Sequence, residues 1–187
     1  MEIQRLGVKF FVVDPLPPSA GRPLSKGESS VRALVPVFHT WIQKQNVEGH
    51  LLIDVHDYSH IHHGPGILLV GHEGNFSLDM ADGKPGLLYY RKQPLTGSPE
   101  DRFETIVKTA LQACKLLEEN PYRFRTDEIL IVANDRLHAP NNEATFTQLA
   151  PVFASVLQKT LGLDFKFNPL DINSGERFAV LGSQMRR

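Results

Sequence analysis

The chain has 187 residues, of which 41% are apolar and 22% are charged, a size and composition that describe one globular domain and exclude a disordered or fibrous protein. Twenty basic residues against twenty-one acidic residues give a formal net charge of −1. No overall field therefore draws the chain to nucleic acid or to anionic lipid, and we expect neither nucleic acid nor a membrane as a partner.

The cysteine content and the N-terminus indicate a cytoplasmic protein. The single cysteine, Cys114, lies at an apolar position of a helical pattern, so a disulfide within the chain is excluded and a buried, unreactive thiol is expected. The N-terminal stretch 1–18 has no apolar run of the length that a signal peptide needs, and no later run approaches the roughly 20 residues of a membrane span. We therefore expect the chain to stay in the cytoplasm.

The first half of the chain reads as a strand, a loop, a helix and a group of strands. An apolar run at 8–14 predicts a strand that ends at Asp14, and the proline-rich stretch 15–30 predicts an exposed loop. A helix is expected within 34–45, with Pro36 near its first turn, where a missing N–H does no harm. Short apolar runs then predict a meander of four strands, at 50–58, 66–72, 75–80 and 86–92.

The second half begins with the clearest helix of the chain, within 97–120. Ser98 is expected as its N-cap and Pro99 as its first helical residue, and Asn120 followed by proline ends it. The remaining elements are predicted in order as a strand at 128–135, a helix within 142–162, and two strands at 164–170 and 177–182.

The two halves share a weak internal repeat. Residues 34–44 and 149–159 agree at six of eleven positions, and each segment follows a strand that ends in aspartate, Asp14 or Asp135. In both halves the helix is followed by one strand that ends in aspartate and another that ends in glycine. This order predicts two duplicated β-α-β-β units.

The fold class predicted from these elements is α+β, with a mainly antiparallel sheet packed on about three helices. Ferredoxin-like arrangements belong to this class. We expect a single compact domain over 1–187, built from two related halves, about 6–72 and 127–183. A β-hairpin and a helix at about 73–121 join these halves.

A histidine-rich loop at 56–66 is the densest cluster of chemically active residues. It holds four of the eight histidines, whereas the equivalent loop of the second half, 172–177, holds none, so a turn at this place does not need them. Alternation along 50–58 predicts two faces, with Leu51, Ile53 and Val55 on one and Leu52, Asp54, His56 and Tyr58 on the other. His60 and His62 share a side if their segment is extended, and His72 and Glu73 follow the next strand.

These side chains are of the types that bind zinc, manganese or iron. The candidate metal ligands are Asp54, His56, His60, His62 and His72, and a divalent metal such as zinc is the candidate cofactor. Glu73 or Asp57 is the candidate catalytic base. The chain has no HExxH motif, no glycine-rich phosphate loop and no GxSxG elbow, so no catalytic motif specifies a reaction. The other interpretation of the loop is a solvated polar connection.

A second candidate site follows the strand at 128–135. Asn134, Asp135, Arg136 and His138 are expected to meet Asp14 across the pseudo-twofold axis and to bind a ligand there. Aspartate and asparagine after a strand also serve as turn and cap residues, so this structural interpretation stays open.

Two functions follow from the two candidate sites. The leading hypothesis is a cytosolic protein that binds a small molecule, or a complex subunit, with no assignable reaction. The alternative is a metal-dependent hydrolase that uses the loop at 56–63 with Asp54 and His72. A homodimer is also predicted, since the strands at 8–14 and 177–182 are expected at sheet edges, where they can pair between subunits.

Overall fold

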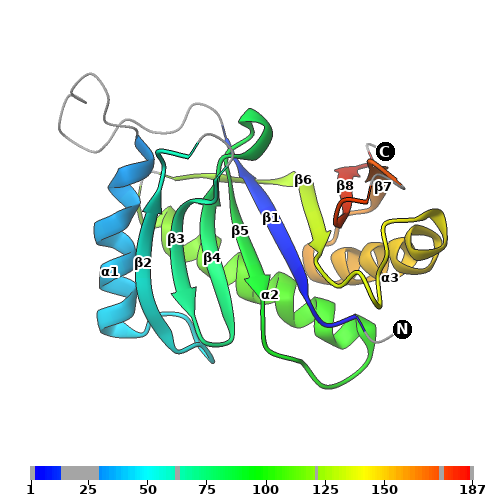
Figure 1. The fold of residues 1–187 in the computed structure, drawn as a ribbon, viewed down its shortest axis with the longest axis horizontal. Coiled ribbons are helices and arrows are strands. Elements are labelled where there is room, and N and C mark those ends of the chain that lie inside the picture. The colour runs from blue at the N-terminus through cyan, green and yellow to red at the C-terminus, as the bar shows by residue number, and fades with distance from the viewer. Residues whose placement is uncertain (1–2, 14–29, 62–63, 121, 173–174, 186–187) are drawn as a thin grey trace.

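The computed structural model describes residues 3–13, 30–61, 64–120, 122–172 and 175–185. In these residues three α-helices pack on one sheet of eight strands (Figure 1), which confirms the predicted α+β class. The strands are β1 (Leu6–Val12), β2 (Leu52–Tyr58), β3 (Gly66–Gly71), β4 (Gly74–Asp79), β5 (Gly86–Arg91), β6 (Phe124–Ala133), β7 (Phe165–Leu170) and β8 (Phe178–Gln184). The helices are α1 (Leu34–Lys44), α2 (Pro99–Glu118) and α3 (Glu143–Leu161), with short 3-10 turns η1 (Ser30–Ala33) and η2 (Ala81–Gly83).

The strands follow the order β2-β3-β4-β5-β1-β6-β8-β7, and every neighbouring pair is antiparallel. β8 pairs directly with β6, whereas β4 and β5 lie between β3 and β1. The topology therefore does not show a duplication, and the two related halves stay a prediction.

The expectation that 8–14 and 177–182 form sheet edges is wrong, because β1 and β8 each have a strand on both sides. The edge strands are β2 and β7, and the homodimer stays a prediction.

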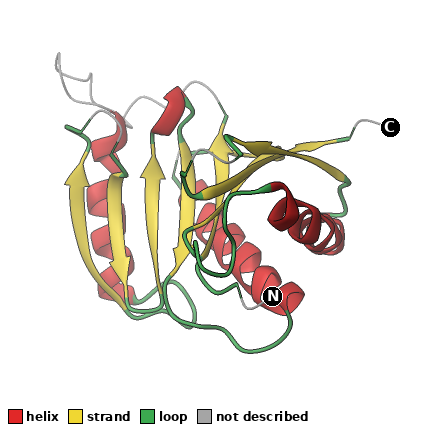
Figure 2. Cartoon of the chain, turned by 45° about the vertical axis from the view of Figure 1, so that its right-hand side comes forward, coloured by secondary structure: helices red, strands yellow, loops and turns green. Residues whose placement is uncertain are grey.

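The helices pack on one face of this sheet. α2 begins as predicted, because the Ser98 hydroxyl accepts a hydrogen bond from the Asp101 N–H while the Asp101 carboxylate accepts one from the Ser98 N–H. Figure 2 shows α1 and α2 behind the same strands, and α3 packs on α2 and β7. Trp41 of α1 meets Phe76 of β4, and Phe153 of α3 meets Phe167 of β7. The main hydrophobic core therefore lies between the helices and this face.

The opposite face of the sheet, the open face, is covered by none of the α-helices of the described residues. Many of its side chains are apolar and only partly buried, and Asn75, Ser77 and the Lys9–Asp79 pair lie among them. Strand register places its apolar residues in adjacent rows across the sheet: Leu68, Val70, Leu88, Tyr90, Leu130, Val132, Ala179 and Leu181. An apolar sheet face of this extent is typical of a binding surface.

Two glycines let long side chains lie across the open face. The Lys9 side chain passes over Gly86, where an added Cβ would lie 2.7 Å from Lys9 Cε, and its ammonium reaches Asp79 on β4 at 2.6 Å. The Tyr90 ring passes over Gly7 in the same way, with Tyr90 Cδ2 only 2.9 Å from an added Cβ. Lys9 therefore links β1 to β4, which are not neighbours in the sheet, and Tyr90 packs β5 onto β1.

The predicted faces of β2 are partly wrong. The register with β3 shifts between Leu52 and Asp54, which marks a β-bulge in this edge strand. Leu52 is therefore buried on the helix side together with Val55, and Ile53, which we expected on the face of Val55, is 53% exposed. A bulge is a common device for preventing an edge strand from pairing with another chain.

Candidate functional site

Three polar residues follow one another across neighbouring strands at one end of the open face. Leu6, Ala133 and Phe178 are aligned in β1, β6 and β8. One step farther toward this end of the sheet, Arg5 precedes β1, Asn134 follows β6 and Arg177 precedes β8. The Asn134 N–H donates a 3.0 Å hydrogen bond to the Arg5 carbonyl, which extends the ladder by this step. Because side chains alternate along a strand, these three point to the same side as the open face.

Tyr90 completes this group, which we call the arginine rim (Arg5, Tyr90, Asn134 and Arg177). Its hydroxyl donates a 3.4 Å hydrogen bond to the Arg5 carbonyl. Burial raises the pKa of the Tyr90 phenol, and the charges of Arg5 and Arg177 and a hydrogen bond with Asn134 only partly offset this effect. Tyr90 is therefore a neutral hydrogen-bond donor at pH 7. Two cations, a phenol and an amide at one place are groups that bind a carboxylate, sulfonate or phosphate.

Asp135 and His138 lie beside the rim and form a hydrogen-bonded pair. Asp135 Oδ1 is 2.9 Å from His138 Nδ1, and Asp135 Oδ2 accepts a 3.4 Å bond from the Gln4 N–H. Burial acts to raise the pKa of Asp135, but the hydrogen bonds from His138 and Gln4 outweigh it and lower the pKa. Because the ionised carboxylate only accepts, Nδ1 carries the proton and Nε2 points away from the pair.

The predicted ligand-binding residues are thus partly gathered at one end of the sheet. Asn134 belongs to the arginine rim, and Asp135 and His138 adjoin it. Arg136 lies exposed in the turn between them. Asp14 lies outside the described residues, so its expected meeting with this group stays a prediction.

Asp54 and His56 share one face of β2, as predicted, and this is the open face. Their side chains approach to 3.5 Å, with both largely exposed. The chain is not extended beyond this strand, because the Ile61 N–H bonds to the Tyr58 carbonyl at 2.9 Å and closes a turn that contains His60. His62 lies outside the described residues.

Asp57, one of the two candidate bases, makes the contacts of a turn residue. Its carboxylate accepts hydrogen bonds from the Ser59 hydroxyl and N–H, and it pairs with Arg32 at 3.0 Å. The hydrogen bonds from Ser59, with the charge of Arg32, lower the pKa of Asp57 although burial opposes them.

His72 and Glu73, the remaining candidates, lie at the other end of β3. His72 Nδ1 is 3.0 Å from Glu73 Oε1, and Glu73 Oε2 accepts a 2.7 Å bond from the Leu51 N–H. The six residues of β3 separate them from the turn at His60 by about 20 Å. Within the described part of the chain, no three histidine, cysteine, aspartate or glutamate side chains gather as metal ligands. The metal site and the hydrolase activity stay predictions.

Sequence reasoning missed two buried polar pairs. The Lys9 side chain is 1% exposed and that of Asp79 is 12% exposed, and they form the 2.6 Å ion pair on the open face. A lysine inside the apolar run 8–14 was a signal for such a partner, because a buried charge needs one. On the helix side, His50 Nε2 lies 2.7 Å from the Tyr89 hydroxyl, and burial lowers the pKa of His50 and raises that of Tyr89.

The chain matches no family model, and no significant match is found among curated proteins or solved structures. None of the helices in the described ranges combines the length and apolar character needed to span a membrane. Cys114 is buried in α2, as predicted, and burial raises the pKa of its thiol well above its ordinary value.

Proposed function

We propose that this protein binds a small amphipathic anion on the open face of its sheet. The anionic group would lie at the arginine rim, and the apolar body of the ligand would lie on the neighbouring strands. The observation that carries this proposal is the position of Arg5 and Arg177 on either side of Asn134, at the border of an apolar sheet surface.

The rim supplies two guanidinium groups, those of Arg5 and Arg177, as donors for an anion. Guanidinium groups bind a carboxylate or sulfonate through paired, charge-assisted hydrogen bonds, which are stronger than bonds between neutral groups. Both arginines are exposed, so a ligand in solution can reach them. The Tyr90 phenol stays neutral and so does not repel an anion, while its one O–H donates to the Arg5 carbonyl.

The apolar body of the ligand would contact the strands next to the rim. Ala179 lies one row inward, beside the buried Val132, and Leu88, Leu130 and Leu181 lie in the following row. Covering about 150 Å² of ligand surface on this floor would contribute about 4 kcal/mol at roughly 25 cal/mol per Å². A purely polar anion lacks this contribution, so we expect the protein to prefer anions that carry an aliphatic or aromatic body.

A fluorescence titration with the apolar sulfonate 8-anilinonaphthalene-1-sulfonate tests the proposal. We expect saturable binding that decanoate displaces and decanol displaces much less well, since decanol has the same chain without the charge. The Arg5→Ala/Arg177→Ala double variant should bind the probe with an affinity lower by a factor of about ten or more.

Arg136→Ala is the matched control, because Arg136 is exposed and lies two residues from Asn134 but outside the rim. It should leave binding unchanged. Equal binding by the double variant and the parent protein, with both folded, would show that the rim does not hold the anion.

A further inference from the structure

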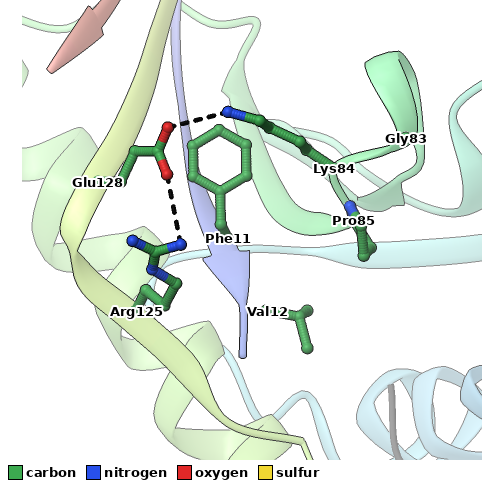
Figure 3. A pocket seen from close by; sticks show the side chains of 7 residues that line it. All are labelled: Phe11, Val12, Gly83, Lys84, Pro85, Arg125 and Glu128. Carbon is green, nitrogen blue, oxygen red and sulfur yellow. Dashed lines mark hydrogen bonds and ion pairs between the residues drawn. The ribbon is translucent and has the colours of Figure 1, made fainter. Parts of the chain in front are cut away.

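A separate pocket lies at the other end of the open face, at the opposite end of β1 from the arginine rim. Its cavity volume is about 190 Å³. Phe11, Val12 and Pro85 supply its apolar lining, and Lys84, Arg125 and Glu128 supply its charges (Figure 3). The aromatic ring of Phe11 lies between Lys84 and the β6 residues in this view.

Glu128 is the anionic centre of the pocket. Its side chain is 17% exposed, and its carboxylate is 3.1 Å from Lys84 Nζ through Oε1 and 3.4 Å from Arg125 Nη1 through Oε2. The Lys84 ammonium also lies 5.7 Å from the centre of the Phe11 ring, within the range of a cation–π contact, and that of Lys9 lies 5.3 Å from the same ring. One position in the pocket therefore offers an ammonium group both a carboxylate and an aromatic ring.

The chain's own Lys84 fills this ammonium position, but it is weakly held. Its side chain is 56% exposed and follows the short η2 turn. An exposed lysine gains little from such a pair, because water solvates it nearly as well and an ordered side chain loses rotamer freedom. A ligand ammonium can therefore take the place of Lys84 beside Glu128 and Phe11 at low cost.

Arg125 is positioned to receive an anion next to this place. Asp127 holds the guanidinium in a two-point contact, with Nε at 2.9 Å and Nη2 at 3.0 Å from the two carboxylate oxygens. The remaining nitrogen, Nη1, faces Glu128 across 3.4 Å. A carboxylate attached to the carbon that bears the ligand ammonium would meet this nitrogen.

We propose that this pocket binds a free α-amino acid with an aliphatic side chain. The ligand ammonium replaces that of Lys84 at Glu128 and over Phe11, the ligand carboxylate binds Arg125, and the side chain contacts Val12 and Pro85. The pairing of one carboxylate with one fixed cation matches a zwitterion, and a cavity of about 190 Å³ admits a molecule of this size. This site is independent of the anion site proposed at the arginine rim.

Isothermal titration calorimetry with L-leucine and two truncated analogues tests the proposal. 3-Methylbutylamine lacks the carboxylate of leucine, and 4-methylpentanoate lacks its ammonium. We expect L-leucine to bind and each analogue to bind at least tenfold more weakly. Equal binding of the amine would show a simple ammonium site and overturn the proposal, as would absence of leucine binding at millimolar concentration.

Three variants test the assigned roles, with circular dichroism to confirm that each is folded. Glu128→Gln and Arg125→Met should each weaken leucine binding about tenfold, whereas Lys84→Met should strengthen it severalfold because it removes the internal competitor. A loss of affinity in Lys84→Met would overturn the proposal. The Arg5→Ala/Arg177→Ala variant should bind leucine normally, which separates this site from the anion site.

Discussion

The buried ion pair on the open face provides the sharpest prediction about stability. Lys9 on β1 reaches Asp79 on β4 across Gly86, and the two groups are 2.6 Å apart with side-chain exposures of 1% and 12%. The Asp79→Asn substitution keeps the shape of the side chain and removes its charge. It therefore leaves the Lys9 ammonium buried without a counter-charge.

The magnitude follows from the distance and the burial. Coulomb attraction across this distance is about 6 kcal/mol at an effective dielectric constant of about 20, and desolvation of the two groups opposes a large part of it. Breaking a buried pair by removing one partner typically costs about 3–5 kcal/mol. At about 2–4 °C per kcal/mol for a chain of this size, Asp79→Asn should lower the midpoint of thermal unfolding by about 6–20 °C.

Urea unfolding followed by circular dichroism measures this free energy. Asp127→Asn is the control, because the Asp127 pair with Arg125 is exposed and should contribute about 1 kcal/mol or less. The Lys9→Met/Asp79→Leu double variant replaces the pair with apolar groups and should recover most of the stability that Asp79→Asn loses. A free energy of unfolding for Asp79→Asn within about 0.5 kcal/mol of the parent protein would refute the reasoning, since ordinary surface substitutions have effects of that size.

Three further predictions concern other features. Gly7→Ala should lower the unfolding free energy measured in a urea titration by about 1–3 kcal/mol, because the added Cβ meets the Tyr90 ring at 2.9 Å and the Tyr89 carbonyl at 3.0 Å. It should also weaken anion binding, and an unchanged unfolding midpoint would contradict this packing. Burial lowers the pKa of His50, so below about pH 6.5 the unfolded chain takes up a proton that folded His50 does not, and the free energy of unfolding should fall as the pH falls. If a His50→Asn variant shows the same dependence of unfolding free energy on pH as the parent protein, His50 is not its source. If the histidine loop binds zinc, elemental analysis should find stoichiometric metal that His56→Ala loses, and a metal-free parent protein would leave the loop as a polar connection.

Local features of the fold were predictable because they depend on neighbouring residues. The Ser98 cap marks the start of α2 correctly, and the helix ends at Glu118, two residues before the predicted end at Asn120, since such end signals act within one helical turn. The strand order was not predictable, because pairing of β1 with both β5 and β6 joins segments far apart in the sequence. The bulge at Ile53 also escaped prediction, since it depends on the register with β3.

The candidate site was predictable only in the part that follows one strand. Asn134, Asp135 and His138 stand together in the sequence, so their proximity could be inferred. Arg5 and Arg177 come to Asn134 only through the pairing of β1, β6 and β8, and no local pattern marks either of them. The histidines form a group in sequence, but the hairpin separates His60 from His72 by the length of β3.

The measurement that tests the central claim most directly is a titration of isotope-labelled protein with decanoate, followed by amide chemical shifts. If the open face binds an amphipathic anion at the arginine rim, the largest shifts should occur at Arg5, Asn134 and Arg177 and at the adjoining residues of β6 and β8. Shifts concentrated on the helix side or around His56, or no saturable shifts below the micelle concentration, would contradict the account.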